Sequence, residues 1–176
     1  VANHLRIARY DMISITKQIC DLFVDWIAMN NVEFHINTQT SVLWVWIDRR
    51  KMEFALRVLL SNALKNTYRF GKISINISVV RSNGKAYCSF SIQDDGLGES
   101  ESTRLGLKQI VDMTESSGAI FEGISSEDET GTQYTILIPL GRSHYMERAV
   151  EFIEPDGDLV KLNEMQKEEI AELIQV

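Results

Sequence analysis

Three polar side chains, Asn62, Lys65 and Asn66, recur at spacings of three and four residues. On an α-helix these positions share one face, so two amides and an ammonium group can meet a single ligand from one side. An amide oxygen is a hard ligand for Mg²⁺, and a lysine offsets phosphate charge. The triplet therefore fits either a metal-bound phosphate chain or the ordinary solvated edge of an amphipathic helix.

A second group with chemical potential is the sequence DDGLG, which contains Asp94, Gly96 and Gly98. A carboxylate can accept a hydrogen bond from an exocyclic amine, and the glycines let the backbone approach a planar ligand closely. An acidic glycine turn is also typical of surface loops. Further along, Gly106 lies near the start of an expected helix over residues 103–117, where glycine costs up to about 1 kcal/mol against alanine. Close approach of a ligand or of neighbouring backbone would explain it.

Hydrophobic periodicity predicts the elements that carry these residues. Asp48 is expected to cap a long helix over residues 48–68, and Asp11 is expected to cap another that ends at Asn30 and Asn31. Strands are predicted over residues 32–37, 42–47, 72–81, 86–93, 119–124 and 132–140, with a hairpin turn at 82–84 and a short edge strand over 3–10. The apolar run 42–47 is typical of a central strand, in which Trp44 and Trp46 pack in the core or form an aromatic ligand platform.

Composition limits the function classes. The length of 176 residues fits one domain with a sizeable core, and no run of residues is apolar enough to cross a membrane. A net charge of -7 without clustered Lys and Arg argues against a nucleic-acid surface. Cys20 and Cys88 lie in apolar contexts, which favours free core thiols in a reducing compartment over a disulfide or a zinc site.

In this order, the segments NALKNT, DDGLG, RLGLKQIV and GTQYTILIPL resemble the N box, the D-x-G-x-G box, the G-L-G-L box and the closing strand of the histidine-kinase catalytic domain. That domain belongs to the ATPase superfamily that includes DNA gyrase, Hsp90 and MutL (the GHKL superfamily). The resemblance covers roughly residues 11–140. It implies the histidine kinase-like ATPase (Bergerat) fold: an α+β two-layer sandwich with a mixed, mostly antiparallel sheet, three helices on one face, and ATP between the helices and the sheet.

The resemblance implies roles for individual residues. Asn62 matches the Mg²⁺-binding asparagine, Lys65 the lysine beside the phosphates, and Asn66 a residue that flanks the nucleotide. Asp94 matches the aspartate that accepts from the adenine amino group, with room given by Gly96 and Gly98. Leu105, Gly106 and Leu107 match the start of the helix beneath the phosphates. Thr132 matches the hydroxyl at the floor of the adenine pocket.

Departures from the family pattern concern catalysis. Val58 stands four residues before Asn62, where the kinases carry asparagine and their hydrolytic relatives glutamate, so it can neither coordinate a metal nor activate water. Ser102 and Arg104 replace two glycines of the glycine-rich box. Only six residues separate Gly98 from Leu105, where the family places a long lid over ATP. A short lid covers the triphosphate poorly unless a partner domain or Arg104 substitutes for it.

The family's acceptor histidine is not recognisable here, because His4, His35 and His144 lack its sequence context. Residues 1–10 are therefore expected to lead in from an upstream dimerisation domain that carries it, and residues 141–176 to form a C-terminal extension with a helix that either docks on the core or links to another module. The implied partners are an adenine nucleotide, that dimerisation domain with its homodimer, and a response regulator or receiver domain. The implied location is cytoplasmic, within a sensor that can be membrane-anchored.

Two functions remain open from the sequence. One is the ATP-binding catalytic domain of a sensor histidine kinase in bacterial two-component signal transduction. The other is a degenerate pseudokinase that keeps the fold as a regulatory or protein-interaction module. Asn62, Asp94 and Gly106 favour the first function, whereas Val58 and the short lid favour the second.

Overall fold

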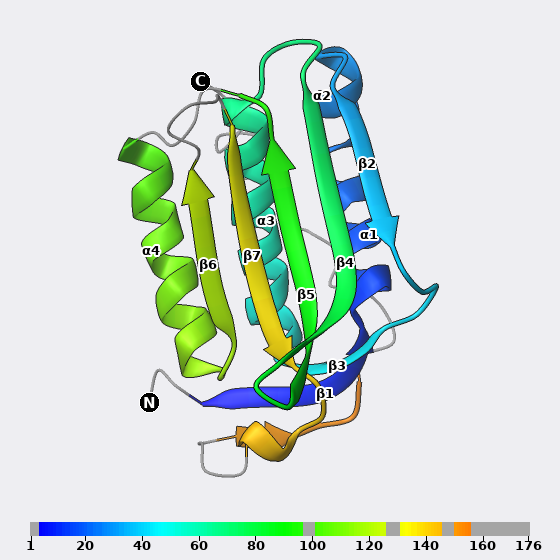
Figure 1. The fold of residues 1–176 in the computed structure, drawn as a ribbon, viewed down its shortest axis with the longest axis vertical. Helices are drawn as coiled ribbons and strands as arrows, with labels where there is room; N and C mark the ends of the chain where they lie inside the picture. The colour runs from blue at the N-terminus through cyan, green and yellow to red at the C-terminus, as the bar shows by residue number, and fades with distance from the viewer. Residues whose placement is uncertain (1–3, 97–100, 126–130, 146–149, 156–176) are drawn as a thin grey trace.

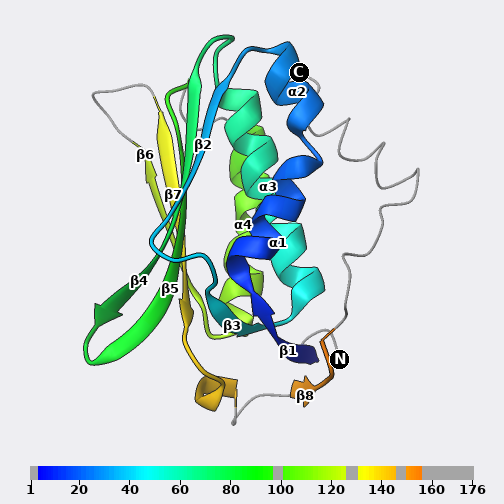
Figure 2. The same ribbon diagram turned by 90° about the vertical axis from the view of Figure 1, so that its right-hand side faces the viewer.

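A computed structural model describes residues 4–96, 101–125, 131–145 and 150–155, without the side chains of residues 101–105, 124 and 125. A five-stranded sheet forms one layer and the helices form the other, all on the same face of the sheet (Figures 1 and 2). This arrangement confirms the predicted two-layer α+β sandwich. Among the described residues, no helix combines the length and the apolar character that a membrane span requires.

The large sheet has the strand order β2-β4-β5-β7-β6. Its strands are β2 (Glu33–Thr38), β4 (Lys72–Ser82), β5 (Lys85–Asp94), β6 (Ile120–Ser125) and β7 (Thr132–Pro139). β2 and β4 run parallel and every other neighbouring pair is antiparallel, so the sheet is mixed and mostly antiparallel, as predicted. The predicted hairpin turn is confirmed too, because Asn83 and Gly84 adopt positive φ angles of 51° and 79°, which a two-residue turn between strands requires.

The helical layer contains α1 (Met12–Asp21), α2 (Val24–Met29), α3 (Arg49–Asn66) and α4 (Glu101–Ser116). Asp11 and Asp48 cap α1 and α3 as predicted, by accepting hydrogen bonds from the backbone amides of Ile13 and Lys51. The single helix expected between Asp11 and Asn30 is instead two helices. The α1 helix ends in a tighter turn, where the Phe23 amide donates to the Cys20 carbonyl at 3.0 Å, and this turn places the Phe23 ring in the core.

A small second sheet has the order β3-β1-β8 and lies at the lower end of the molecule in Figure 2. Its strands are β1 (Leu5–Asp11), β3 (Trp44–Ile47) and β8 (Val150–Phe152). The strand expected over residues 3–10 is present as β1, but its predicted edge position is wrong, because β1 pairs on both sides. The strand expected over 42–47 is present as β3, but its predicted central position is wrong, because β3 lies at the edge of the sheet. Trp44 is 51% exposed, while Val45 and Ile47 are buried.

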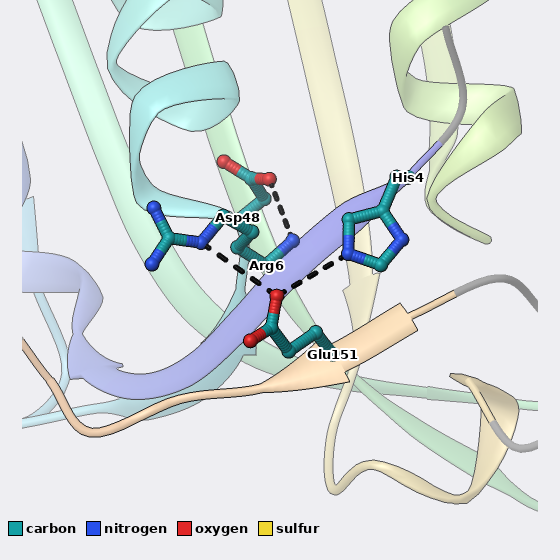
Figure 3. A network of polar contacts seen from close by, with 4 residues as sticks. All are labelled: His4, Arg6, Asp48 and Glu151. Atoms are coloured by element: carbon teal, nitrogen blue, oxygen red, sulfur yellow. Dashed lines mark hydrogen bonds and ion pairs between the residues drawn. The ribbon is translucent and has the colours of Figure 1, made fainter. Parts of the chain in front are cut away.

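Polar contacts tie β8 and α3 to β1 (Figure 3). The Arg6 backbone amide donates to Asp48 at 3.0 Å, and the Glu151 carboxylate lies 3.3 Å from His4 Nε2 and 3.9 Å from Arg6 Nε. The Tyr145 hydroxyl donates to the Trp46 carbonyl at 2.6 Å. These contacts bring the segment after β7 back against the first strand of the chain.

The core between the layers is apolar except at a few places. Cys20 and Cys88 are free and buried, as predicted, and burial raises the pKa of each thiol to about 12. The first turns of α3 contain a buried ion pair between Arg49 Nε and Glu53 Oε1 at 2.8 Å. The other buried polar side chains gather mainly near the opposite end of α3.

Candidate functional site

The predicted site residues come from four elements that converge at one end of the molecule. The last turns of α3, the end of β5, the start of β7 and the start of α4 all lie at the upper end of Figure 1. The pairing of β5 with β7 places Asp94 directly opposite Thr132. The end of α3 carries the first of the four motifs recognised in the sequence, and the other three meet around it.

On α3, Asn62 and Asn66 lie one turn apart and are each only 5% exposed, while Lys65 is partly buried. The Nδ2 atoms of both asparagines lack a hydrogen-bond partner among the described residues. Leaving a buried amide unpaired costs about 1–3 kcal/mol, so such groups normally face a polar ligand or water. The geometry therefore favours a ligand-facing strip over the solvated helix edge that the sequence also allowed.

Asp94 is 4% exposed at the end of β5. Its carboxylate accepts from the Gly96 amide at 3.0 Å and from the Thr132 backbone amide. Burial outweighs these hydrogen bonds and, with the neighbouring Asp95 charge, raises the pKa of Asp94 to about 6. A carboxylate held in this way is a strong acceptor that is still charged at neutral pH.

The glycines of the site are explained by close backbone contacts. A Cβ on Gly96 would overlap the Asn66 carbonyl oxygen, so this loop touches the last turn of α3 directly. A Cβ on Gly131, at φ +125°, would lie 2.5 Å from the Asp94 carbonyl oxygen. These glycines hold the DDGLG loop against α3 and against β7. Gly98 lies outside the described residues.

Gly106 of α4 faces α3, where a Cβ would lie 3.4 Å from Val58 Cγ1 and 4.0 Å from Asn62 Nδ2. Because α4 begins at Glu101, two residues earlier than predicted, Gly106 and its neighbours lie in the second turn, where backbone amides already bond within the helix. The Leu107 side chain is buried in the main core. The side chain of Leu105 is not described.

Thr132 is 3% exposed, and its hydroxyl lacks a hydrogen-bond partner among the described residues. Sequence reasoning missed Ser61, which is fully buried next to Asn62. Its hydroxyl also lacks a hydrogen-bond partner among the described residues. It also missed Asp95, whose Oδ1 accepts from the Lys72 amide at 3.0 Å and so fixes the start of β4. A serine inside an apolar stretch of helix and a doubled aspartate were the available signals.

The polar atoms fit a nucleotide that brings its own metal better than a metal held by the protein alone. No group of three or more His, Cys, Asp or Glu side chains within the described ranges could hold an ion. A single amide from Asn62 suits Mg²⁺, which usually keeps several waters and takes its other ligands from substrate phosphates. The donor set therefore accommodates a magnesium nucleotide.

Comparison with known proteins agrees with this geometry. No protein-family model matches the chain. Histidine kinase P4 of Formosa agariphila is 22% identical over an alignment 172 residues long that covers 84% of this chain, and the chain spans only 12% of that protein. The nucleotide-free catalytic domain of histidine kinase ThkA superposes with a TM-score of 0.67 at 20% identity, covering 77% of this chain and 96% of the domain.

Two larger structures show the same likeness in assembled proteins. ThkA in complex with the response regulator TrrA gives a TM-score of 0.65 at 20% identity, over 77% of this chain and 42% of that one. Full-length ShkA in complex with AMPPNP gives 0.63 at 17% identity, over 77% and 31%. The chain therefore has the fold of the catalytic domain of histidine kinases.

Proposed function

We propose that this chain is the ATP-binding catalytic domain of a sensor histidine kinase, which transfers the γ-phosphoryl group of Mg·ATP to a histidine on a separate dimerisation domain. One observation carries the proposal. The buried side chains of Asn62, Asn66 and Thr132, each with an unpartnered polar atom among the described residues, gather where Asp94 ends β5. Full-length ShkA, which contains a similar fold, has been solved in complex with the ATP analogue AMPPNP.

Different residues of the site contact different parts of the nucleotide. Asp94 accepts from the amino group of adenine, Thr132 lines the same pocket, and Gly96 and Gly98 leave room for the base. Asn62 supplies a metal ligand and Lys65 a positive charge for the phosphates, with Asn66 beside the nucleotide. Gly106 has no side chain, so it leaves space on α4 next to Asn62. Leu105 and Leu107 flank it in the part of α4 that lies beneath the phosphates.

The chemistry that this chain can perform is positioning and charge compensation. A bound Mg²⁺ would neutralise charge on the phosphate oxygens. The protein's own groups orient the nucleotide so that the acceptor histidine can attack the γ-phosphorus in line. Val58 is buried against the position of Gly106 and presents only methyl groups there. Water is therefore not activated at this point, which favours transfer to a histidine over hydrolysis.

The partners follow from the same proposal. The acceptor histidine belongs to an upstream dimerisation domain that forms a homodimer, and the phosphoryl group passes on to a response regulator, as the ThkA complex with TrrA suggests. The domain works in the cytoplasm, within a sensor that can be membrane-anchored. The alternative is a pseudokinase, which would keep this fold for protein contacts without binding nucleotide.

Calorimetric titration with ADP and a non-hydrolysable ATP analogue, with and without Mg²⁺, tests the proposal. We expect binding of the ATP analogue that strengthens with Mg²⁺, and we expect Asn62→Ala to remove the Mg²⁺ dependence. Asn76→Ala is the matched control, because Asn76 is exposed on the open face of the sheet and should leave binding unchanged. Absence of binding at millimolar nucleotide would refute the proposed function and support the pseudokinase.

A further inference from the structure

An exposed cluster of aromatic and arginine side chains covers part of the outer face of the small sheet. We define this aromatic face by Trp44, Trp46, Phe152, Arg9 and Arg142. The Arg9 guanidinium lies 4.6 Å from the centre of the Trp44 ring, and that of Arg142 lies 4.8 Å from Trp46 and 5.2 Å from Phe152. The Trp46 and Phe152 rings meet edge to face at 6.1 Å.

Only one half of this side of the sheet is covered by the described chain. Tyr145 packs over Leu5 and Ile7 and buries them. Beyond Tyr145, Trp44 stays 51% exposed and Phe152 40% exposed. Tryptophan and arginine are the side chains most enriched at the energetic centres of protein interfaces. The exposed half therefore has the composition of a contact surface.

The charge of this surface restricts what can cover it. Arg9 and Arg142 are exposed on the aromatic face, whereas Arg6 is exposed on the opposite face of the same sheet, where it lies next to Glu151 in register. The acid within β8, Glu151, already contacts His4 and Arg6, and Glu154 follows β8 on the exposed chain. A two-fold contact with a second copy would bring the same arginines toward each other. An acidic apolar segment meets both the rings and the charges without that repulsion.

We propose that residues 156–176 of this chain dock on the aromatic face. These residues lie outside the described part of the structure, but their sequence has the required chemistry. Six carboxylates stand against two lysines, which gives the segment a net charge of -4. The apolar residues Met165, Ile170, Leu173 and Ile174 recur at helical spacings. The described chain ends at Pro155, three residues after Phe152, so the segment leaves the core at the edge of this face.

Photocrosslinking of the full chain tests this contact. Trp44 is replaced by p-benzoyl-phenylalanine, which keeps an aromatic group at that position, and crosslinked peptides are identified by mass spectrometry after irradiation. We expect crosslinks within one chain, independent of protein concentration, between position 44 and residues 156–176. Leu173→Asp should abolish them while leaving the thermal unfolding of the core unchanged.

Charge variants separate a specific contact from a chance collision. Arg9→Glu should reduce the crosslink yield, and reversing Glu168, Glu169 and Glu172 to lysine in the same chain should restore it. Arg81→Glu is the matched control, because Arg81 is an exposed arginine on β4, a strand of the large sheet and not of the small sheet. Crosslinks between two chains would replace the proposal by a dimer contact. The absence of crosslinks between position 44 and residues 156–176 would overturn the proposal. So would crosslinks to this segment from p-benzoyl-phenylalanine placed at Met29 on α2 instead of position 44.

Discussion

Replacing Asp94 by asparagine should remove a contribution to stability that is present at low pH. At high pH, where Asp94 is charged, the same replacement should weaken nucleotide binding. Burial raises the pKa of Asp94 from 3.8 to about 6, so the folded protein takes up this proton near pH 6 and the unfolded chain only near pH 4. Between these values the folded state holds more protons than the unfolded state. The free energy of unfolding that Asp94 contributes is therefore full below about pH 4 and is lost as the pH rises through 6.

The size of the effect follows from the displacement of the pKa. At 1.36 kcal/mol per pKa unit, a change from 3.8 to about 6 corresponds to about 3 kcal/mol at most. Solvent screening at the mouth of the site lowers this value, so we expect roughly 1–3 kcal/mol between pH 4 and pH 8. Asparagine does not titrate, so the variant lacks this pH dependence of the free energy of unfolding. Its changed hydrogen bonds shift that free energy by the same amount at every pH.

Urea unfolding followed by tryptophan fluorescence at pH values from 4.5 to 8 measures the effect as wild type minus Asp94→Asn. We expect this difference to fall as the pH rises, and Asp25→Asn, which removes an exposed acid on α2, is the matched control for the loss of one carboxylate. At pH 8 the same Asp94 variant should bind adenine nucleotide more weakly by roughly 1.5–3 kcal/mol. A stability difference that is flat across this range would refute the burial argument, and equal nucleotide affinities would refute the adenine assignment.

Three further substitutions test the packing of the fold. Gly96→Ala must displace the loop from α3, so it should lower the free energy of unfolding by about 3 kcal/mol or more and should also impair nucleotide binding. Gly84→Ala meets open space but lies at positive φ, so it should lower the free energy of unfolding by roughly 1–2 kcal/mol. Equal losses for the two variants in urea unfolding would contradict the close contact at Gly96. Glu53→Ala breaks the buried ion pair with Arg49 and should lower the free energy of unfolding by about 3–5 kcal/mol, and a loss below 1 kcal/mol would show that this pair contributes little to stability. Tyr145→Phe deletes the hydrogen bond to β3 and should lower stability by about 1 kcal/mol in the same assay, with no change expected in nucleotide affinity.

The sequence predicted the elements whose signals are local. Asp48 caps α3 and the turn at Asn83 and Gly84 closes a hairpin because neighbouring residues determine both features. The small sheet could not be predicted in the same way. β1 is central only because Val150, near the other end of the described chain, pairs with Leu5, and the exposure of Trp44 follows from the edge position of β3.

The site shows the same division. The order of the motifs predicted which elements meet, and the structure places the end of α3, the end of β5 and the start of β7 at one end of the fold (Figure 1). These segments carry Asn62, Asp94 and Thr132. Sequence reasoning considered Gly96 only in relation to a ligand and missed that a side chain there would meet the Asn66 carbonyl. A backbone contact between distant segments leaves no periodic signal in a single sequence.

The pairing of β8 with β1 has a mechanical consequence. The two strands run parallel, and the Ile153 amide extends the ladder by donating to the Ile7 carbonyl at 2.8 Å. A pull applied at residue 4 and residue 155 acts on opposite ends of this pair, so it loads the hydrogen bonds together in shear and does not open them one by one. Tension from flanking segments would then be borne at this end of the molecule, while the end that holds Asp94 stays unloaded until β8 slips.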